Sequence, residues 1–436
     1  MSVNVKSIVN ELDQTFISDK LKFYQEEHRR LTVLFNITRN ISTELNLDRV
    51  LLTLMDEVKK ALMADRCTVF LLDRNTNEIW SKVAHGEEEI RFPSHLGIAG
   101  YVATTGEILN IPDAYADSRF NPDIDRQTGY LTKNMLTFPM RNKRREIIGV
   151  FQVLNKYDGI FTKEDEQLLD AISVISAAQL ENAQLYEEQK ETFESFIETL
   201  ASTIDARDPL TAGHSHRIAR YADAIAEIMN IDEEKREIIK YAALLHDYGK
   251  IAIREAILTK RGRLTVEEYK HIKEHPAYTK SILEKINFSE NYKRIPLIAA
   301  AHHERMDGTG YPDGMNGSEI PIESRILAVA DVFDALTSKR HYRDRMKLKK
   351  VMHMIQSNVG THFDTECVGA FEEIRLDKLI LILEESNASF IDIDDLKILS
   401  KCNVKTLLEN QGQSKNGSET IIEQIFNKYY SRNYSK

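Results

Sequence analysis

One stretch of this chain limits its possible folds more than any other, because residues 162–208 contain neither glycine nor proline and are rich in Glu, Gln, Ala and Leu. Glycine and proline often end helices, so the sequence predicts one long helix here. Its apolar positions form a stripe at helical spacing: Leu185, Phe193, Phe196, Leu200 and Ile204. The stripe could pair with the same helix of a second copy or pack on the chain's own domains, and the sequence does not choose between the two.

The sequence changes character across this helix. Before it, β-rich runs such as 67–73 and 147–154 alternate with Gly, Pro, Asn and Asp, which predicts an α+β domain with a central antiparallel sheet and flanking helices. After it, the pattern is almost wholly helical and predicts an all-α domain. We therefore expect a multidomain chain with these parts: a helical lead-in (1–29), the sheet domain (30–180), a helical linker that could form a coiled coil (181–204), the all-α domain (205–372) and a C-terminal extension without an assigned role (373–436).

Composition disfavours several classes of function. The chain has 58 Lys and Arg residues against 68 Asp and Glu residues, a net charge of −10, whereas proteins that bind polymeric nucleic acid usually present a basic surface. Its 3 cysteines are too scattered to suggest a disulfide framework or a cysteine zinc site. No apolar run approaches the roughly 18 residues typical of a membrane span, and the first residues lack a signal-peptide pattern. We expect a soluble cytoplasmic protein without membrane contact.

Histidine and aspartate residues stand where apolar helical runs end. The pair His246-Asp247 follows the run 238–245, and the pair His302-His303 follows the run 295–301. A buried imidazole beside a carboxylate, or two adjacent imidazoles, needs polar partners, and a metal ion can serve both. Lys250 would place a positive charge near a bound phosphate, although a charged helix end would also explain it.

Helical periodicity separates His214 from its neighbour. His214 shares the apolar stripe that contains Ile218 and Ile225, whereas His216 falls off it. We therefore predict that His214 is a metal ligand and that His216 lies on the surface.

At two further positions, a nearby residue of the same type competes for the role of metal ligand. Asp331 lies in a run that is apolar on most sides, so its carboxylate must be paired or bound to metal, while nearby Asp334 is better explained as a structural hydrogen-bonding group. His275 lies on an apolar face, and spacing alone does not exclude His271 in its place.

The order of these residues resembles the HD-GYP family of cyclic dinucleotide phosphodiesterases over roughly residues 205–372. The runs that carry the resemblance are Leu-Leu-His-Asp-Tyr-Gly-Lys (244–250) and His-His-Glu-Arg-Met-Asp-Gly-Thr-Gly-Tyr-Pro (302–312). Tyr248 replaces the usual isoleucine of the family and leaves every ligand in place. The resemblance implies two divalent metal ions, Fe or Mn, with these ligands: His214, His246, Asp247, His275, His302, His303 and Asp331. Leu210 stands where some members have a glutamate for a third metal, so two metals are expected.

The same resemblance implies hydrolysis of cyclic di-GMP to linear pGpG, with further cleavage to GMP and a cyclic GMP-AMP substrate left open. Asp247 and Lys250 are the residues that it implies for catalysis. The glycines of the second run would allow close backbone approach, a tyrosine ring could face a nucleobase, and guanidinium groups match phosphate oxygens. The expected substrate-binding residues are Arg305, Asp307, Gly308, Gly310, Tyr311, Pro312 and Arg340. The main alternative is a module that docks partner signalling proteins through the Gly-Tyr-Pro loop.

Residues 30–185 resemble a GAF domain through the runs 97–102, 110–114 and 125–132 and the pair Asn155-Lys156. Asn155-Lys156 with Phe161 and Asp165-Glu166 is similar to GAF domains that bind cyclic mononucleotides. The resemblance implies cAMP or cGMP as a ligand of these residues: Arg66, Thr68, Ile98, Ala99, Asp125, Thr128, Thr132 and Gln152. A salt bridge between Lys156 and Asp165 is the simpler reading of that pair. We expect a homodimer in which the GAF domain regulates the enzyme through the long helix.

Overall fold

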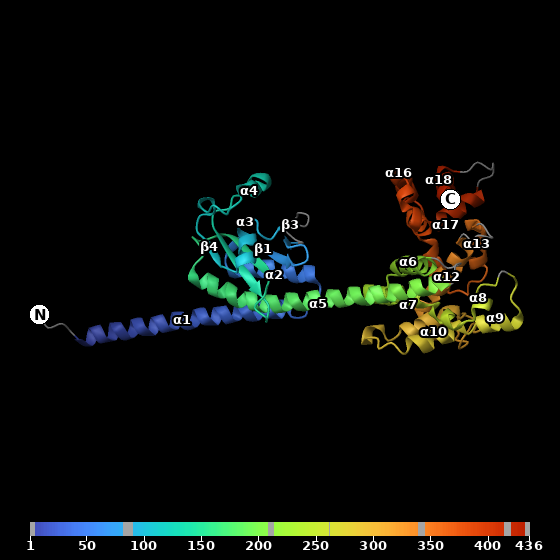
Figure 1. Cartoon of the computed structure of the whole chain (residues 1–436), viewed down its shortest axis with the longest axis horizontal. Helices are drawn as coiled ribbons and strands as arrows, with labels where there is room; N and C mark the ends of the chain where they lie inside the picture. The colour runs from blue at the N-terminus through green and yellow to red at the C-terminus, as the bar shows by residue number, and fades with distance from the viewer. Residues whose placement is uncertain are drawn as a thin grey trace. The chain divides into compact units, whose positions relative to one another are not determined.

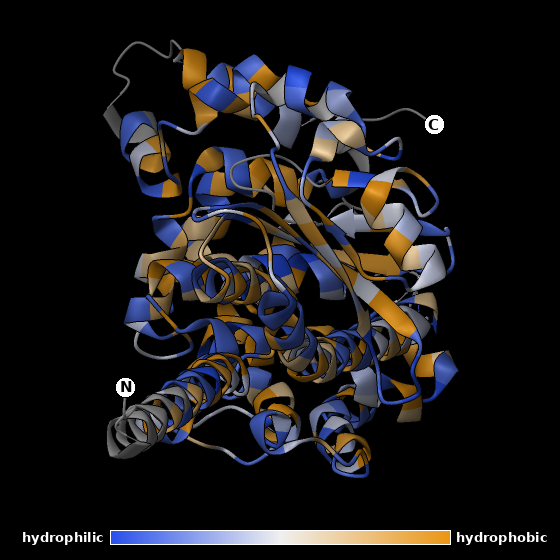
Figure 2. Ribbon diagram, turned by 90° about the vertical axis from the view of Figure 1, so that its left-hand side faces the viewer, coloured by the Kyte–Doolittle hydropathy of each residue, from blue (hydrophilic) through white to orange (hydrophobic). Residues whose placement is uncertain are grey.

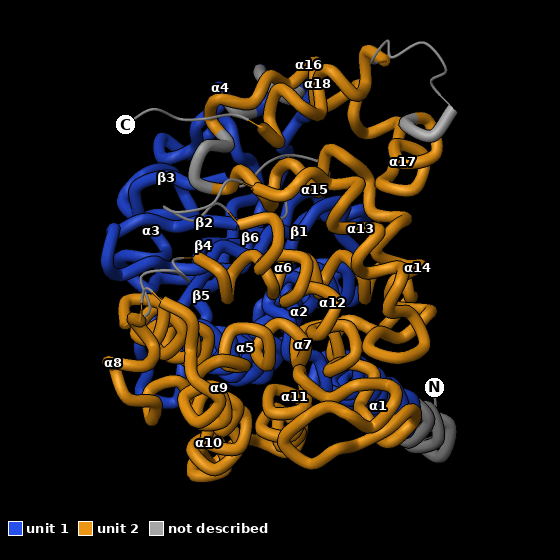
Figure 3. Tube along the Cα trace, turned by 90° about the vertical axis from the view of Figure 1, so that its right-hand side faces the viewer, with its two compact units in different colours: residues 1–192 blue, residues 193–436 orange. Residues whose placement is uncertain are grey.

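The computed structural model describes residues 5–81, 90–207, 213–260, 262–338, 345–413 and 420–431, without the side chains of residues 5–15, 19, 124, 127–128, 386–388 and 411–413. The chain forms two compact units, residues 1–192 and 193–436, which Figure 3 colours separately. The sheet lies in unit 1 and the helical region in unit 2 (Figure 1).

A six-stranded sheet with strand order β3-β2-β1-β6-β5-β4 organises unit 1, and all its neighbouring strands are antiparallel. This arrangement confirms the predicted α+β class. The strands are β1 (Ala64–Asp73), β2 (Glu78–Ser81), β3 (Ile90–Pro93), β4 (Leu109–Ile111), β5 (Met135–Arg141) and β6 (Ile147–Lys156). The helices are α1 (Val5–Ile41), α2 (Leu47–Ala61), α3 (Gly97–Thr105), a 3-10 turn η1 (Ala114–Ala116), α4 (Pro122–Thr128) and the start of α5 (Lys163–Arg207).

Side-chain alternation gives the sheet of unit 1 two different faces. Cys67, Val69 and Leu71 of β1 point to one face, where they pack with α2 and α5 in the main core. Phe70 points to the other face and packs with Ala99 and Val102 of α3. The second face therefore lies under α3.

The predicted long helix is α5, which runs without interruption through the boundary between the units. In unit 2, Ile197 and Ala201 belong to the core, Phe193 and Leu200 pack against it, and Ile204 is also buried. Phe196 and Leu185 remain 48% and 57% exposed. Most of the apolar stripe in unit 2 thus packs on the chain itself, and its pairing with a second copy stays a prediction for the exposed positions.

The named elements of unit 2 are all helical. From the N-terminus they are α6 (His214–Ile228), α7 (Glu233–Leu245), η2 (Tyr248–Ala252), α8 (Glu255–Leu258), α9 (Val266–Ile272), α10 (His275–Leu283), η3 (Glu290–Tyr292), α11 (Ile295–Ala300), η4 (Ala301–His303), η5 (Gly317–Glu319), α12 (Ile322–Thr337), α13 (Leu348–Gln356) and α14 (Thr365–Glu372). Figure 2 shows apolar and polar residues on the same helices, as expected for helices with one buried face.

The C-terminal extension continues the core of unit 2. It contains α15 (Leu376–Leu383), η6 (Glu385–Phe390), α16 (Ile393–Leu399), α17 (Val404–Gln413) and α18 (Ile421–Tyr430). Leu379, Phe426 and Tyr429 belong to the same buried cluster as Phe333 of α12. The Arg345 guanidinium also donates to the backbone carbonyl oxygens of Leu383 and Tyr430. The extension is therefore packed onto the helical domain, although its role stays open. Across the described segments, no helix combines the length and apolar character needed to cross a bilayer.

Candidate metal centre

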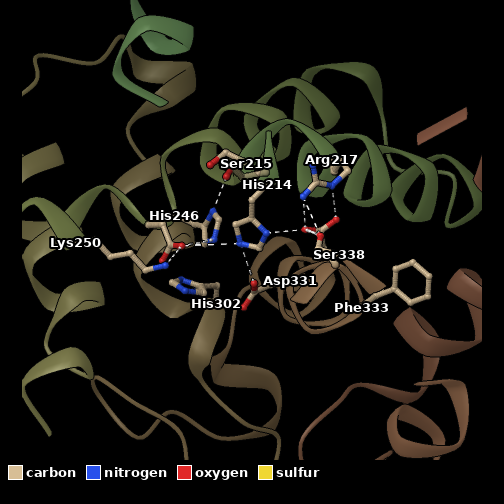
Figure 4. A network of polar contacts seen from close by, with 12 residues as sticks. His214, Ser215, Arg217, His246, Lys250, His302, Asp331, Phe333 and Ser338 are labelled. Atoms are coloured by element: carbon tan, nitrogen blue, oxygen red, sulfur yellow. Dashed lines mark hydrogen bonds and ion pairs between the residues drawn. The ribbon is translucent and has the colours of Figure 1, made fainter. Parts of the chain in front are cut away.

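Helix ends of unit 2 bring together all the histidine and aspartate residues predicted as metal ligands. His214 opens α6, His246-Asp247 follows α7, and His275 opens α10. His302 and His303 follow α11 in η4, and Asp331 lies within α12. Figure 4 shows several of them converging from different elements. We call this set the metal centre: His214, His246, Asp247, His275, His302, His303 and Asp331.

Three histidines of the metal centre share one hydrogen-bond pattern. The Nδ1 atoms of His246, His275 and His302 lie 2.6, 2.8 and 2.6 Å from carbonyl oxygens three residues earlier, those of Ala243, Ile272 and Ala299. A carbonyl can only accept, so each Nδ1 carries the proton and each Nε2 keeps a lone pair. All three Nε2 atoms are buried and have no hydrogen-bond partner among the residues that the structure describes. Such orphaned lone pairs are what a metal ion would occupy.

Asp247 lies between histidines on two sides. One carboxylate oxygen, Oδ1, is 3.2 Å from His275 Nε2, and the other, Oδ2, is 3.4 Å from His246 Nε2. Oδ2 also lies 2.5 Å from the Lys250 ammonium nitrogen. Because its two oxygens face different imidazoles, this carboxylate has the geometry to bridge two cations.

The donor atoms gather into overlapping groups of metal-binding geometry. His275, His302 and His303 form one group, and His214, His246 and Asp331 form another, with the donor atoms of each group within 4.8 Å of one another. A further group of the same size joins Asp247 with His246 and His302. The first two groups share no residue, so the donor set fits two ions with Asp247 between them. Imidazole and carboxylate donors without thiolates suit divalent Fe or Mn and do not distinguish them.

Asp334 holds His214 in place from outside the metal centre. His214 Nδ1 lies 2.8 Å from Asp334 Oδ2, while its Nε2 lies 3.3 Å from Asp331 Oδ1. The Asp334 carboxylate is fully buried and also accepts from Arg217 Nε at 2.7 Å and from the Ser338 hydroxyl. A carboxylate behind a ligand histidine fixes its tautomer and ring orientation. Asp334 thus has a structural hydrogen-bonding position, and Asp331 faces the centre.

The electrostatics keep most of the imidazoles neutral. Burial lowers the pKa of His302 well below its usual value, lowers that of His246, and lowers that of His303 to about 3. Burial tends to raise the pKa of Asp247, but the positive charge of Lys250 and the polar contacts with the His246 and His275 side chains outweigh it and lower this pKa well below the usual range. Neutral imidazoles around an ionised carboxylate are the protonation states that metal binding requires.

His214 behaves differently from the other histidines in the metal-free protein. Burial tends to lower its pKa, but hydrogen bonds to the Asp331 and Asp334 carboxylates outweigh this effect and raise the pKa to about 10. A metal ion that binds His214 Nε2 must therefore displace a proton.

The histidines that compete with the predicted ligands, His271 and His216, belong to none of the donor groups found among the described residues. His271 Nδ1 bonds to Glu274 instead, at 2.8 Å, and His271 belongs to none of the groups. His216 is half-buried rather than exposed, and it too lies outside these groups. Leu210, which decides the predicted absence of a third metal, lies outside the described residues.

The loop that follows His303 is folded around a buried carboxylate. Glu304 is 2% exposed and accepts from the backbone N–H groups of Asp313 and Gly314 at 2.7 and 3.1 Å. A Cβ on Gly310 would lie 2.5 Å from the Glu304 Cα, so a larger residue cannot fit there. Gly310 therefore serves the close packing of the loop on itself, a different reason from the predicted approach to a ligand.

The predicted substrate residues of this loop lie in different environments. The Tyr311 ring packs 4.8 Å from the His303 ring, between centroids, and half-buried Pro312 follows it. Gly308 has φ +76°, a conformation that favours glycine. Arg305 is exposed, and the Asp307 carboxylate accepts from the Thr309 N–H and hydroxyl groups. Arg340 lies outside the described residues.

Comparison with known proteins places both units in families. A GAF domain model matches residues 46–180, and an HD domain model matches residues 198–367. A 3'3'-cGAMP-specific phosphodiesterase of Vibrio cholerae is 42% identical over 180 residues, which are 41% of this chain and 38% of the relative. A cyclic di-GMP phosphodiesterase response regulator of Xanthomonas campestris is 41% identical over 186 residues, 42% of this chain and 47% of the relative. The chain has a GAF domain followed by an HD domain.

The similarity to these proteins is confined to part of their length. A cyclic di-GMP phosphodiesterase of Thermotoga maritima is also matched over only part of its length, with 40% identity over 184 residues that cover 49% of that protein. The match thus spans less than half of each of these relatives.

Several residues that support the HD domain were not predicted from sequence. The Thr279 hydroxyl donates to the His246 carbonyl oxygen and accepts from the Gly249 N–H at 2.8 Å. A Cβ on Gly249 would lie 1.9 Å from the His275 carbonyl oxygen, so the lack of a side chain here allows α10 to approach closely. Glu304 directly follows His303, and Thr279 comes four residues after His275. This closeness to predicted ligands is the signal in the sequence that could have indicated the two residues.

Asp205 at the end of α5 ties this helix to the start of α6. Its carboxylate accepts from the Gly213 N–H at 2.9 Å and from the Ser215 hydroxyl at 3.3 Å. Both groups flank His214. The last turn of α5 therefore holds the backbone that presents this histidine to the metal centre.

The predicted ligand positions of the GAF domain lie around the second face of its sheet. Thr68, Gln152 and Thr137 are paired across β1, β6 and β5, so their side chains form one polar row. Ile98 and Ala99 of α3 are buried. The Thr137 hydroxyl, which the sequence did not indicate, is buried and has no hydrogen-bond partner in the described part of the chain.

Other predicted positions in the GAF domain are already bonded within the protein. The Asp125 carboxylate accepts from the Thr132 N–H and hydroxyl groups at 2.7 and 2.9 Å, and from the Tyr115 hydroxyl. The Arg66 guanidinium lies 3.8 Å from the centre of the Tyr130 ring. The structure does not describe the side chain of Thr128. Lys156 and Asp165 form the ion pair that the sequence suggested as the simpler reading.

Proposed function

We propose that this chain is a metal-dependent phosphodiesterase that hydrolyses a cyclic dinucleotide, with cyclic di-GMP as the substrate and cyclic GMP-AMP as the alternative. The observation that carries the proposal is the convergence of orphaned Nε2 atoms on His246, His275 and His302 around the Asp247 carboxylate. The names of the HD-domain relatives support the same substrate class. A mononucleotide phosphohydrolase would leave His275, His302 and His303 without a purpose.

The residues of the metal centre have separable tasks in this reaction. Bound divalent cations, which we propose to be Fe or Mn, would lower the pKa of water and stabilise negative charge on phosphate oxygens. Asp247 keeps its charge because Lys250 lies beside it, and Asp334 keeps the His214 ring oriented. The Tyr311 ring beside His303 offers a face to a nucleobase. Water adds to phosphorus, the bond to the 3' oxygen breaks, and that oxygen takes up a proton, giving linear pGpG.

The GAF domain would regulate this reaction through a small ligand. We propose cAMP or cGMP at the polar row of Thr68, Thr137 and Gln152, because a hydroxyl without a partner inside a domain is a place for a ligand's polar group. Asp205 gives α5 a direct connection to His214. A homodimer, a cytoplasmic location and the domain boundaries expected from sequence belong to the same proposal.

One experiment tests the proposed function. The full chain is loaded with Fe or Mn and assayed for hydrolysis of cyclic di-GMP and of cyclic GMP-AMP, with and without cAMP or cGMP. We expect turnover of at least one cyclic dinucleotide and a change of rate with one mononucleotide. A folded, metal-loaded protein without turnover of either would favour the docking module over the enzyme.

A further inference from the structure

Lys273 is a cation near the metal centre that the proposed reaction leaves unused. It lies between α9 and α10, two residues before His275, and is half-buried. Its ammonium nitrogen is 5.2 Å from the centre of the Tyr269 ring and 4.8 Å from the centre of the Tyr311 ring. Two aromatic faces therefore bracket this charge.

The charge of Lys273 is not neutralised within the described part of the chain. Lys250 pairs with Asp247 at 2.5 Å, whereas Lys273 makes no ion pair with a carboxylate among the residues that the structure describes. Contact with aromatic rings stabilises a cation without cancelling its charge. A half-buried ammonium without a counter-ion is therefore suited to an anionic ligand.

The position of Lys273 relates it to the metal centre. The Tyr311 ring that it contacts also packs on the His303 ring, at 4.8 Å between centroids. The distance from the Lys273 ammonium to the centre of the His303 ring therefore cannot exceed the sum of the two distances that each of them makes to the Tyr311 ring. An anion near Lys273 would lie beside the metal centre and outside its donor groups.

A cyclic dinucleotide supplies an anion of this kind. Its macrocycle contains two phosphodiester groups, and only one can occupy the metal centre at a time. We propose that Lys273, bracketed by Tyr269 and Tyr311, binds the second phosphate, the one that is not being cleaved. This inference rests on the proposed function and deepens it, because it gives the site a preference for diesters that carry a second phosphate.

Two substrates and two matched variants test the subsite. Lys273→Met keeps the apolar stem and removes the charge, and Lys270→Met on exposed α9 is the control. Both full-length variants are loaded with Mn and assayed with cyclic di-GMP and with bis(4-nitrophenyl) phosphate, which has a single phosphodiester. For cyclic di-GMP we expect Lys273→Met to lower kcat/KM by ~10- to 100-fold, mainly through KM, as expected for a lost charged hydrogen bond. The nitrophenyl ester should be cleaved within about twofold of the wild-type rate.

Binding provides a readout that does not depend on turnover. Equilibrium dialysis with a phosphorothioate analogue of cyclic di-GMP should show weaker binding to Lys273→Met by the same factor, while Lys270→Met binds as the wild type does. Equal losses on both substrates would mean that Lys273 supports the metal centre itself and would overturn the subsite. An unchanged KM and unchanged binding would overturn it too. A wild-type protein that cleaves only the nitrophenyl ester would instead refute the proposed function.

Discussion

The two domains treat their buried polar groups in opposite ways. In the HD domain, the Nε2 atoms of His246, His275 and His302 are held toward one another with no hydrogen-bond partner. In the GAF domain, Asp125 is already bonded to Thr132 and Tyr115, and Thr137 in the polar row keeps a buried hydroxyl without a partner among the described residues. The HD site is thus preorganised for a strong ligand such as a metal ion, whereas a GAF ligand would compete with bonds inside the protein. Substitutions should accordingly have large effects in the first site and small effects in the second.

The largest effect is expected from removing the central pair of the metal centre. The double substitution His246→Ala with Asp247→Ala should abolish metal uptake and hydrolysis together, because it removes one ligand of the group formed with His214 and Asp331, and also the carboxylate that lies between the imidazoles of His246 and His275. Metal content by elemental analysis and cyclic di-GMP turnover measure the two outcomes. His216→Ala, outside the described donor groups, should change neither. Retained turnover in the double variant would refute the assignment of the centre.

A smaller effect is expected from the carboxylate behind His214. Asp334→Asn keeps the shape of the side chain but removes the charge that orients His214 and pairs with Arg217. Losing such a supporting group typically costs ~10- to 100-fold in metal affinity. Titration with Mn measures this loss, and Asp223→Asn, which removes a partly exposed partner of Arg236, is the control. Equal metal affinity in Asp334→Asn and wild type would contradict the role of Asp334.

The residues of the metal centre could be predicted from the sequence more readily than the contacts of Asp334 and Lys273. The seven members of the metal centre stand at or beside the ends of apolar helical runs, or within one, so local patterns indicated most of them, while the choice of His275 over His271 came from the family resemblance. The hydrogen bond between Asp334 and His214 joins residues that are 120 positions apart in the sequence. Lys273 likewise contacts the Tyr311 ring only because the fold brings the two residues together. Contacts of this kind depend on tertiary packing, which no local pattern encodes. The α+β and all-α classes, by contrast, followed from periodicity alone.

Acid should destabilise the metal-free HD domain moderately. Burial lowers the pKa values of His246, His302 and His303, that of His303 to about 3, whereas an unfolded chain has histidine pKa values of about 6.5. Below about pH 6.5 the unfolded chain therefore binds more protons, so the free energy of unfolding falls as the pH falls. His214, with its pKa raised to about 10, contributes stability that is complete below about pH 6.5 and is lost as the pH rises toward 10, so it opposes this trend above pH 6.5 and has little effect below it.

Urea unfolding in the presence of a chelator tests this dependence at pH 6.5, 6.0 and 5.5, the range in which His214 has little effect on it. We expect the midpoint to decrease along this series, and His303→Ala to decrease less steeply because it removes one of the neutral imidazoles. His216→Ala should follow the wild type. A midpoint that rises toward pH 5.5 would show that the buried histidines do not control acid stability.

The smallest effect, and the sharpest test of the contrast between the domains, concerns Thr137. Thr137→Val replaces a buried, unpartnered hydroxyl with a methyl group of similar size. Without ligand, the variant should be as stable as the wild type or more stable by up to ~1 kcal/mol, since no hydrogen bond is lost and an unsatisfied group is removed. If the hydroxyl serves a ligand, affinity for cAMP or cGMP should fall by ~5- to 10-fold, the value of one neutral hydrogen bond. Thermal unfolding and calorimetric titration measure the two quantities. Lower stability with unchanged affinity would mean that this hydroxyl is satisfied within the protein, and the polar row would then no longer be a candidate ligand site.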